Sequence, residues 1–433
     1  MTDVGGVETT LLLVLLGCAA AARLALGGSS SGSSGSAAGG VRSAYLVVYA
    51  LATLGDWLQG PYAYRLYESY GHSAGVIGAL AVTGYTSAFF FGNVTGPVAD
   101  AYGRRRMALA YCLVYALSGA TKMTASLPVL FLGRVLSGIA TSLLSSVFES
   151  WMTSEHAADG GARDALNTTF ARAHLLSGLM AITSGLLADA STQTPLGLRG
   201  PFVLSASALA LAGVAVMALW RRENYGSRGL PPVSLWRGAM QTTISDPQVA
   251  ILGIVQALTE GAMYGMVYVW APMLEAAAGD EPVPLGRVFA CLMVSVMLGS
   301  TLFEMYTRSS SLRRCDMETL HAFSLASAGL ALLAAAYSSS YKQLLFSFCI
   351  FEGALGMYFP CQASMRAQHL PPSMRTVINS IFRMPLNVFA VVSILTTPTR
   401  GFQATLESCG CALLVAMVLW SLFAVYGSKK KLA

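Results

Sequence analysis

The sequence predicts an all-α membrane protein, with two bundles of six helices and an extra hydrophobic segment in front of them. Of the 433 residues, 55% are hydrophobic and only 11% are charged, whereas a soluble domain carries about 25% charged residues. Twelve apolar runs follow residue 43, and each is close to the ~20 residues that a helix needs to cross a bilayer. A short motif at the start of the fifth run recurs at the start of the eleventh, which indicates that two halves repeat each other.

The chain opens with an apolar stretch, Leu11 to Leu26, which is short for a span and contains Arg23. It could be a signal peptide, a signal anchor or an extra first helix, and the lack of a basic segment before it disfavours the signal peptide. The Gly/Ser stretch that follows, Gly27 to Gly40, is typical of a flexible linker. We therefore expect residues 1–43 to lie outside the two bundles.

The twelve runs share a bilayer-crossing length, and they are 44–62, 74–99, 107–125, 128–152, 166–190, 200–220, 248–273, 285–307, 318–338, 342–364, 374–397 and 401–426. The longest polar connection, residues 221–247, separates the sixth run from the seventh. We therefore expect an N-terminal bundle at 44–220, a cytoplasmic central loop, a C-terminal bundle at 248–427 and a basic cytoplasmic tail at 428–433.

The loop between the second and third runs carries an acid, two glycines and three consecutive arginines. Short cytoplasmic loops collect Lys and Arg, so this loop is expected inside. Its spacing, Gly96-x-x-x-Asp100-x-x-Gly103-Arg104, resembles a loop signature of the major facilitator superfamily. The resemblance implies that Asp100 and Arg104 hold the two halves together on the cytoplasmic side and do not touch the substrate.

Alternation from this loop predicts the side of every other loop. The basic residues then expected inside are Arg163, Arg221, Arg222, Arg228, Arg237, Arg308, Arg313, Arg314, Arg366, Arg375 and Lys429 to Lys431. The outside loops hold chiefly Arg65, Arg199 and Arg400. This asymmetry agrees with the positive-inside rule, although it was not used to place the first loop.

The repeated motif is followed in each half by an arginine at nearly the same depth, within one residue of register. The fifth run reads Arg-Asp-Ala-Leu-Asn-Thr-Thr-Phe-Ala-Arg over 163–172, and the eleventh reads Arg-Thr-Val-Ile-Asn-Ser-Ile-Phe-Arg over 375–383. At 1.5 Å per residue, Arg172 and Arg383 lie roughly 12–14 Å from the inner face. Secondary transporters built from related halves place their substrate sites near this depth.

Charged groups inside the runs are the candidate site. A cation at the bilayer centre costs at least ~2.5–3.5 kcal/mol, so Arg172 and Arg383 are expected to line an aqueous pathway, unless they form structural ion pairs. Arg134, near the outer end of the fourth run, is a further candidate or simply snorkels outward. Four carboxylates could serve as counter-charges or take up a coupling proton, and they are Asp56, Glu149, Glu260 and Glu352. For Glu149, near the inner surface, a structural role is at least as well supported.

Neutral donors near these charges could complete an anion site, and they are Gln59, Tyr62, Asn167, Thr168 and Asn379. No nucleotide-binding loop, metal-ligand spacing or hydrolase motif accompanies them, so we expect neither an enzyme nor a bound metal or cofactor. The net charge of +6 comes from short loops between apolar runs, which does not indicate nucleic-acid binding. The expected partners are an anionic substrate, the lipid bilayer and a coupling proton.

Longer segments resemble the molybdate-anion transporter family, and they are Gly55–Tyr62, Gly133–Leu144, Phe148–Trp151, Glu260–Tyr264 and Phe382–Asn387. The resemblance covers nearly all of residues 42–427. It implies a major facilitator-type fold with pseudo-two-fold symmetry, and molybdate uptake by alternating access, most naturally at the plasma membrane. The residues alone predict only a secondary transporter compatible with anions. A carrier of another anion or of a sugar, and a transport-inactive receptor or scaffold, remain alternatives.

Overall fold

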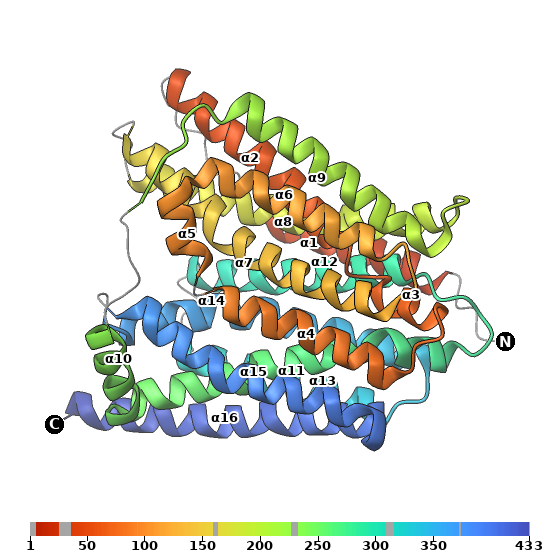
Figure 1. Ribbon diagram of the computed structural model, residues 1–433. Helices are drawn as coiled ribbons and strands as arrows, with labels where there is room; N and C mark the ends of the chain where they lie inside the picture. The colour runs from red at the N-terminus through yellow and green to blue at the C-terminus, as the bar shows by residue number, and fades with distance from the viewer. Residues whose placement is uncertain are drawn as a thin grey trace. The chain divides into compact units, whose positions relative to one another are not determined.

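The computed structural model describes residues 6–25, 36–92, 94–158, 163–226, 233–308, 316–371 and 374–432 (Figure 1). Every regular element in these ranges is helical, and ten helices are long and apolar enough to cross a membrane. Two further helices, α2 and α6, bring the long helices after the N-terminal segment to the twelve that the sequence predicts. The expectation of an all-α membrane protein is confirmed.

The chain divides into two compact units, which we call the N-unit and the C-unit. The N-unit is Ser29–Leu230 with Pro284–Ala290, and the C-unit is Met1–Gly28, Pro231–Val283 and Cys291–Ala433. The domain limits given above remain predictions.

In the N-unit, α2 packs on α8 and α9, and α7 packs on α4 and α6. Its elements are α2 (Ser36–Trp57), α3 (Ala63–Ser69), α4 (Ala74–Gly92), α5 (Thr95–Tyr102), α6 (Arg104–Thr121), α7 (Leu127–Ala158), α8 (Arg163–Thr192), η1 (Gly197–Arg199) and α9 (Gly200–Leu219). The indole rings of Trp151 and Trp220 stack in the buried core at a centroid distance of 3.8 Å. Small residues let helices approach closely in a membrane: a methyl group on Gly138 of α7 would lie 2.6 Å from the carbonyl oxygen of Gly84 in α4.

In the C-unit, α16 packs on α11 and α13, while α14 packs on α13 and α11. Its elements are α1 (Val7–Ala25), α10 (Val233–Ser245), α11 (Pro247–Ala278), α12 (Leu285–Arg308, of which the part up to Ala290 groups with the N-unit), α13 (Met317–Ala336), α14 (Tyr341–His369), α15 (Arg375–Arg400) and α16 (Phe402–Leu432). The backbones of α12 and α14 are in close contact at Gly299 and Gly353. A methyl group on Gly299 would overlap the carbonyl oxygen of Gly353, so only glycine fits there.

The N-terminal apolar stretch is helix α1, and it belongs to the C-unit. Its buried side chains are Glu8, Leu12 and Ala19, whereas Leu13 and Val14 are exposed. Burial thus recurs on one face of the helix, as expected for a helix that packs along one side. Of the alternatives weighed above, this geometry fits an extra helix.

Several local predictions need correction. The Gly/Ser stretch is not a linker throughout, because α2 already begins at Ser36; residues 26–35 lie outside the described part. The central connection contains helix α10, whose Ala239 is fully buried. Such a short amphipathic helix is too brief and too polar to register as a span. The predicted inside residues Arg228, Arg313 and Arg314 lie outside the described ranges.

Candidate functional site

A polar cluster in the C-unit joins helices α11, α14 and α15. The Nη1 group of Arg366 donates a hydrogen bond of 2.9 Å to Oε1 of Gln256. Gln256 also hydrogen-bonds Glu260, whose carboxylate lies within electrostatic reach of both Arg366 and Arg383. The Glu260 carboxylate is therefore under the electrostatic influence of two guanidinium groups.

The local sequence explains this convergence. Gln256 and Glu260 are four residues apart on α11, so their side chains lie on one face of the helix. A methyl group on Gly253 would lie 2.5 Å from the ring of Phe382, so the glycine makes room for this ring on α11. Phe382 is buried against α11, whereas the next residue, Arg383, is exposed. The buried ring fixes α15 and the guanidinium stays accessible.

Sequence reasoning missed Arg366 because it placed this residue in an inside loop. The structure places it in the last turn of α14, which continues to His369. Membrane helices extend beyond the apolar core, so an arginine just after an apolar run is often still helical. The stem of three methylene groups lets the guanidinium of Arg366 reach Gln256 on α11.

The other C-unit candidates are less clearly connected to this cluster. Glu352 is buried on α14, and no ion pair links it to an arginine in the described part of the chain. Asn379 has a buried side-chain oxygen that accepts no hydrogen bond from any described residue. Tyr358, on α14, is fully buried and lies within electrostatic reach of Glu260.

In the N-unit, Arg172 of α8 is exposed. Asn167, one turn before Phe170 in the same helix, and Glu149 of α7 are also exposed. Thr169 and Ala173 of the same helix are buried. The arginine therefore lies on the open face of α8, not against the core. Each unit thus presents an accessible arginine directly after the repeated motif, within one residue of the same register.

Arg134 has a different environment. Its Nε donates a hydrogen bond of 3.0 Å to the carbonyl oxygen of Leu80 in α4. Its guanidinium fills the space over Gly84, where a methyl group would lie 2.9 Å from Nη2, and it also reaches Tyr67. These contacts tie α7 to α4, so an anchoring role explains the conformation of Arg134 in this structure.

Gln59 and Tyr62 are both buried and already bonded within the N-unit. Oε1 of Gln59 accepts a hydrogen bond of 2.7 Å from Nζ of Lys122, and its Nε2 donates to Oγ of Ser205 at 3.0 Å. The Tyr62 hydroxyl donates to Oδ1 of Asp189 at 2.5 Å. Sequence reasoning missed Lys122 and Asp189, although a lysine inside the run 107–125 was itself a signal.

Asp189 also caps a helix. Its two carboxylate oxygens accept hydrogen bonds of 2.7 and 2.9 Å from the backbone N–H groups of Gly286 and Arg287 in the first turn of α12. Carboxylates are favourable at this position because the first N–H groups of a helix lack partners. Asp56, one turn before Gln59, accepts a 2.6 Å hydrogen bond from the Tyr115 hydroxyl.

The glycine and arginine motif forms a compact cluster in the N-unit. Arg104 donates from Nη2 and Nε to Oδ1 of Asp100 at 2.7 and 3.0 Å, and from Nη1 to the carbonyl oxygen of Ser150 at 3.0 Å. Gly103 connects α5 to α6 with φ of 103°. Gly96 has open space where a side chain would be. These contacts tie α5 and α6 to α7.

Comparisons with known proteins show the family to which the chain belongs. A family described as sugar transporters with 12 transmembrane helices matches residues 10–353. Molybdate-anion transporters of Xenopus laevis and Danio rerio are each 31% identical, over 387 and 380 residues; the alignments cover 86% and 81% of this chain and 83% and 78% of those proteins.

Solved structures are similar in fold alone. The nucleoside transporter NupG aligns with a TM-score of 0.73 at 13% identity, over 88% of this chain and 99% of that chain. The human organic anion transporter MFSD10 aligns with a TM-score of 0.61 at 17% identity, over 89% and 100%. This is an integral membrane protein with several spans, and the chain belongs to the molybdate-anion transporter family within the major facilitator superfamily.

Proposed function

We propose that this protein is a secondary transporter that takes up molybdate across the plasma membrane. The observation that carries the proposal is the 31% identity, over most of the chain, to proteins named molybdate-anion transporters. Molybdate is a tetrahedral dianion, so its oxygens require several charge-assisted donors. Guanidinium groups supply directed donors and keep their charge at any working pH.

The C-unit cluster supports one half of such a site. Arg383 is accessible, and Glu260 lies within electrostatic reach of both Arg383 and Arg366. An arriving dianion would replace the Glu260 carboxylate as the partner of these guanidinium groups. Protonation of Glu260 would ease the exchange, because a neutral carboxyl releases the arginines to the substrate; this gives a route for proton coupling.

Arg172 supplies the corresponding donor in the N-unit. We infer that Arg172 and Arg383 both contact the oxyanion during transport, since the repeated motif places them at matched depth and both are accessible. Asn167 and Asn379, one helical turn and more before them, would add neutral donors. For Gln59 and Tyr62 a substrate role requires that the present contacts with Lys122 and Asp189 open first.

A second candidate function is sugar transport, which the description of the matching family favours. A sugar is neutral and needs no cationic donor, so two accessible arginines and a partly buried carboxylate fit it less well. A transport-inactive receptor or scaffold is a third reading, and it gives no reason for charged groups to be kept inside spans.

Uptake of labelled molybdate by cells that express the chain tests these functions. We expect saturable uptake that unlabelled molybdate suppresses and that sugars leave unchanged, with sulfate and phosphate as graded competitors. Uptake suppressed by a sugar, or absent despite verified surface expression, would overturn the proposal. Repeating the assay across external pH values tests the proton coupling separately, because a pH-independent rate leaves molybdate transport intact and excludes Glu260 as the coupling group.

A further inference from the structure

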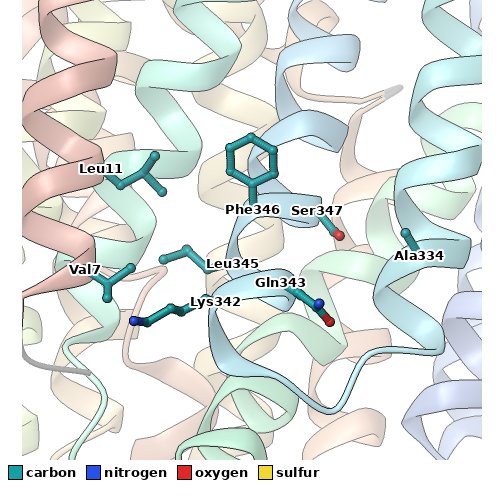
Figure 2. Close-up of a pocket in the computed structure, with 8 residues that line it drawn as sticks. All are labelled: Val7, Leu11, Ala334, Lys342, Gln343, Leu345, Phe346 and Ser347. Carbon is teal, nitrogen blue, oxygen red and sulfur yellow. The ribbon is translucent and has the colours of Figure 1, made fainter. Parts of the chain in front are cut away.

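A groove in the C-unit is bounded by helices α1, α13 and α14. It has a volume of about 470 Å³, within the range of ligand sites in proteins, about 300–1,000 Å³. Figure 2 shows Val7 and Leu11 of α1 on one side and Ala334 of α13 on the other. Between them lie five residues of α14, namely Lys342, Gln343, Leu345, Phe346 and Ser347. None of these residues belongs to the charged cluster of α11, α14 and α15.

The N-terminal helix forms one wall of this groove because it is held by two contacts. The Tyr341 hydroxyl donates a short hydrogen bond to Oε1 of Glu8. The Cys291 thiol donates to the Glu8 carbonyl oxygen at 3.4 Å. Glu8 is fully buried, so its side chain faces into the unit, and Val7 and Leu11 lie beside it along the groove.

The polarity of the groove changes along its length. Val7 is the first residue of α1, Lys342 is the second residue of α14, and Ala334 lies in the last turn of α13. Three helix ends therefore meet at the level of Lys342, where a membrane helix reaches the interface. One turn deeper, Leu11 and Phe346 line the groove with apolar side chains beside the small hydroxyl of Ser347, and Figure 2 shows Leu11 and Phe346 at the end away from Lys342.

A charged end at the interface and apolar side chains below it match the two parts of a phospholipid, an anionic headgroup and an acyl chain. Lys342 is exposed, and no carboxylate of the described residues pairs with it. The topology predicted above places this end of α14 at the outer face, where a lipid phosphate can accept a charge-assisted hydrogen bond from the Lys342 ammonium group. A free oxyanion would need several directed donors, and the groove offers one ammonium group above apolar walls.

We propose that the groove between α1, α13 and α14 binds an anionic glycerophospholipid, with its phosphate on Lys342 and an acyl chain along Leu11 and Phe346. The N-terminal helix then contributes to a lipid site and is more than a membrane anchor. The proposal is independent of the transported solute, because the lipid site shares no residue with the proposed oxyanion site.

The test uses the purified full chain in nanodiscs with photoactivatable phosphatidylserine, and with a diacylglycerol that carries the same photoactivatable chain. We expect crosslinks to concentrate on Val7 to Leu11 and Leu345 to Ser347. Ala334→Trp should fill the groove and lower this labelling at least about fivefold for both lipids. Val415→Trp, at an exposed position of α16, is the matched control and should leave it unchanged.

The charged end is tested with Lys342→Gln. It should lower phosphatidylserine labelling severalfold, because the phosphate loses a charge-assisted hydrogen bond, and leave diacylglycerol labelling unchanged. Arg400→Gln, at an exposed helix end of the same unit, should change neither. Labelling spread evenly over the lipid-facing helices and insensitive to Ala334→Trp would overturn the site. Suppression of the labelling by millimolar inorganic phosphate or molybdate would assign the groove to a free oxyanion and overturn the lipid proposal.

Discussion

Arg366 and Gln256 are joined by a hydrogen bond of 2.9 Å from Nη1 to Oε1, although 110 positions separate them in the chain. The bond fixes the guanidinium of α14 beside Glu260, which is itself bonded to Gln256. Arg366 therefore belongs to the charged cluster of α11, α14 and α15, and the charge balance of that cluster can be tested directly.

The first prediction concerns coupling between Arg366 and Glu260. Arg366→Gln alone leaves a partly buried carboxylate with less compensation, so it should lower the thermal stability of the purified protein more than Arg366→Gln combined with Glu260→Gln. Groups in one polar network show interaction energies of about 0.5–3 kcal/mol. A thermal-unfolding double-mutant cycle in detergent measures this.

A matched control for this cycle is the pair Arg308 and Glu304, whose Nη2–Oε1 distance is 2.7 Å at the exposed end of α12. Exposed pairs four residues apart are worth only about 0.3–0.5 kcal/mol. The changes in unfolding free energy at the control pair should nearly add. If those of Arg366→Gln and Glu260→Gln add as well, the two groups do not interact and the cluster is wrongly assigned.

The second prediction concerns the ion pair of Asp100 with Arg104. Asp100→Asn removes a charge from the contact that ties α5 and α6 to α7, and leaves the proposed substrate arginines untouched. The transport rate should fall severalfold, while the dissociation constant of molybdate stays within about twofold of the parent. Measurements of initial uptake rate and of equilibrium binding separate the two quantities. A large loss of binding at an unchanged rate would place Asp100 in the substrate site instead.

The third prediction contrasts the two glycines of the same motif. Gly103 has φ of 103°, and a methyl group there would overlap the side chain of Glu223. Gly103→Ala should therefore destabilise the protein by about 1–3 kcal/mol. Gly96 is in helix α5 and has open space at the same point, so Gly96→Ala should be neutral or stabilise by up to about 1 kcal/mol. Equal melting temperatures for the two variants would show that Gly103 is not strained.

Local composition predicts the helices well, because a span must be apolar over its whole length whatever it packs against. The same reasoning cannot find helix α10, since a short helix on a surface has no compositional threshold to cross. It also assigns Gly and Ser before Gly40 to a linker, because these residues have low helix propensity. The structure shows α2 beginning at Ser36, where the context overrides that propensity.

The candidate site is only partly accessible to sequence reasoning. Arg383 and Glu260 can be named from their depth in apolar runs. Arg366 cannot, because it lies beyond the end of its run, and only the structure shows its contact with Gln256. Lys122 is the converse case, because it lies within an apolar run and was still not named as a candidate. Its ammonium group is buried, hydrogen-bonded to Gln59 and 5.3 Å from the ring of Phe202. A charged residue within an apolar run marks an interaction without naming its partner.

The last prediction concerns the arginines of the repeated motif, Arg172 and Arg383. If both contact the oxyanion, replacing either with Gln removes a charge-assisted contact worth roughly 1.5–3 kcal/mol, which corresponds to about one to two decades of affinity. Lysine should restore only part of this loss, because an ammonium group cannot form the forked contact of a guanidinium. Molybdate binding to purified protein and uptake at verified surface expression measure the effect.

Arg400→Gln is the control for charge, since Arg400 is an exposed arginine at the far end of α15 from the motif. It should leave molybdate affinity unchanged while Arg383→Gln, in the same helix, weakens it. The two motif variants should also lower affinity by similar factors, because the repeat places the two arginines within one residue of the same register. If both bind molybdate as tightly as the parent, the oxyanion site lies elsewhere. Arg134 is then the next guanidinium to test, and its hydrogen bond to the Leu80 carbonyl would have to open before it could reach a substrate.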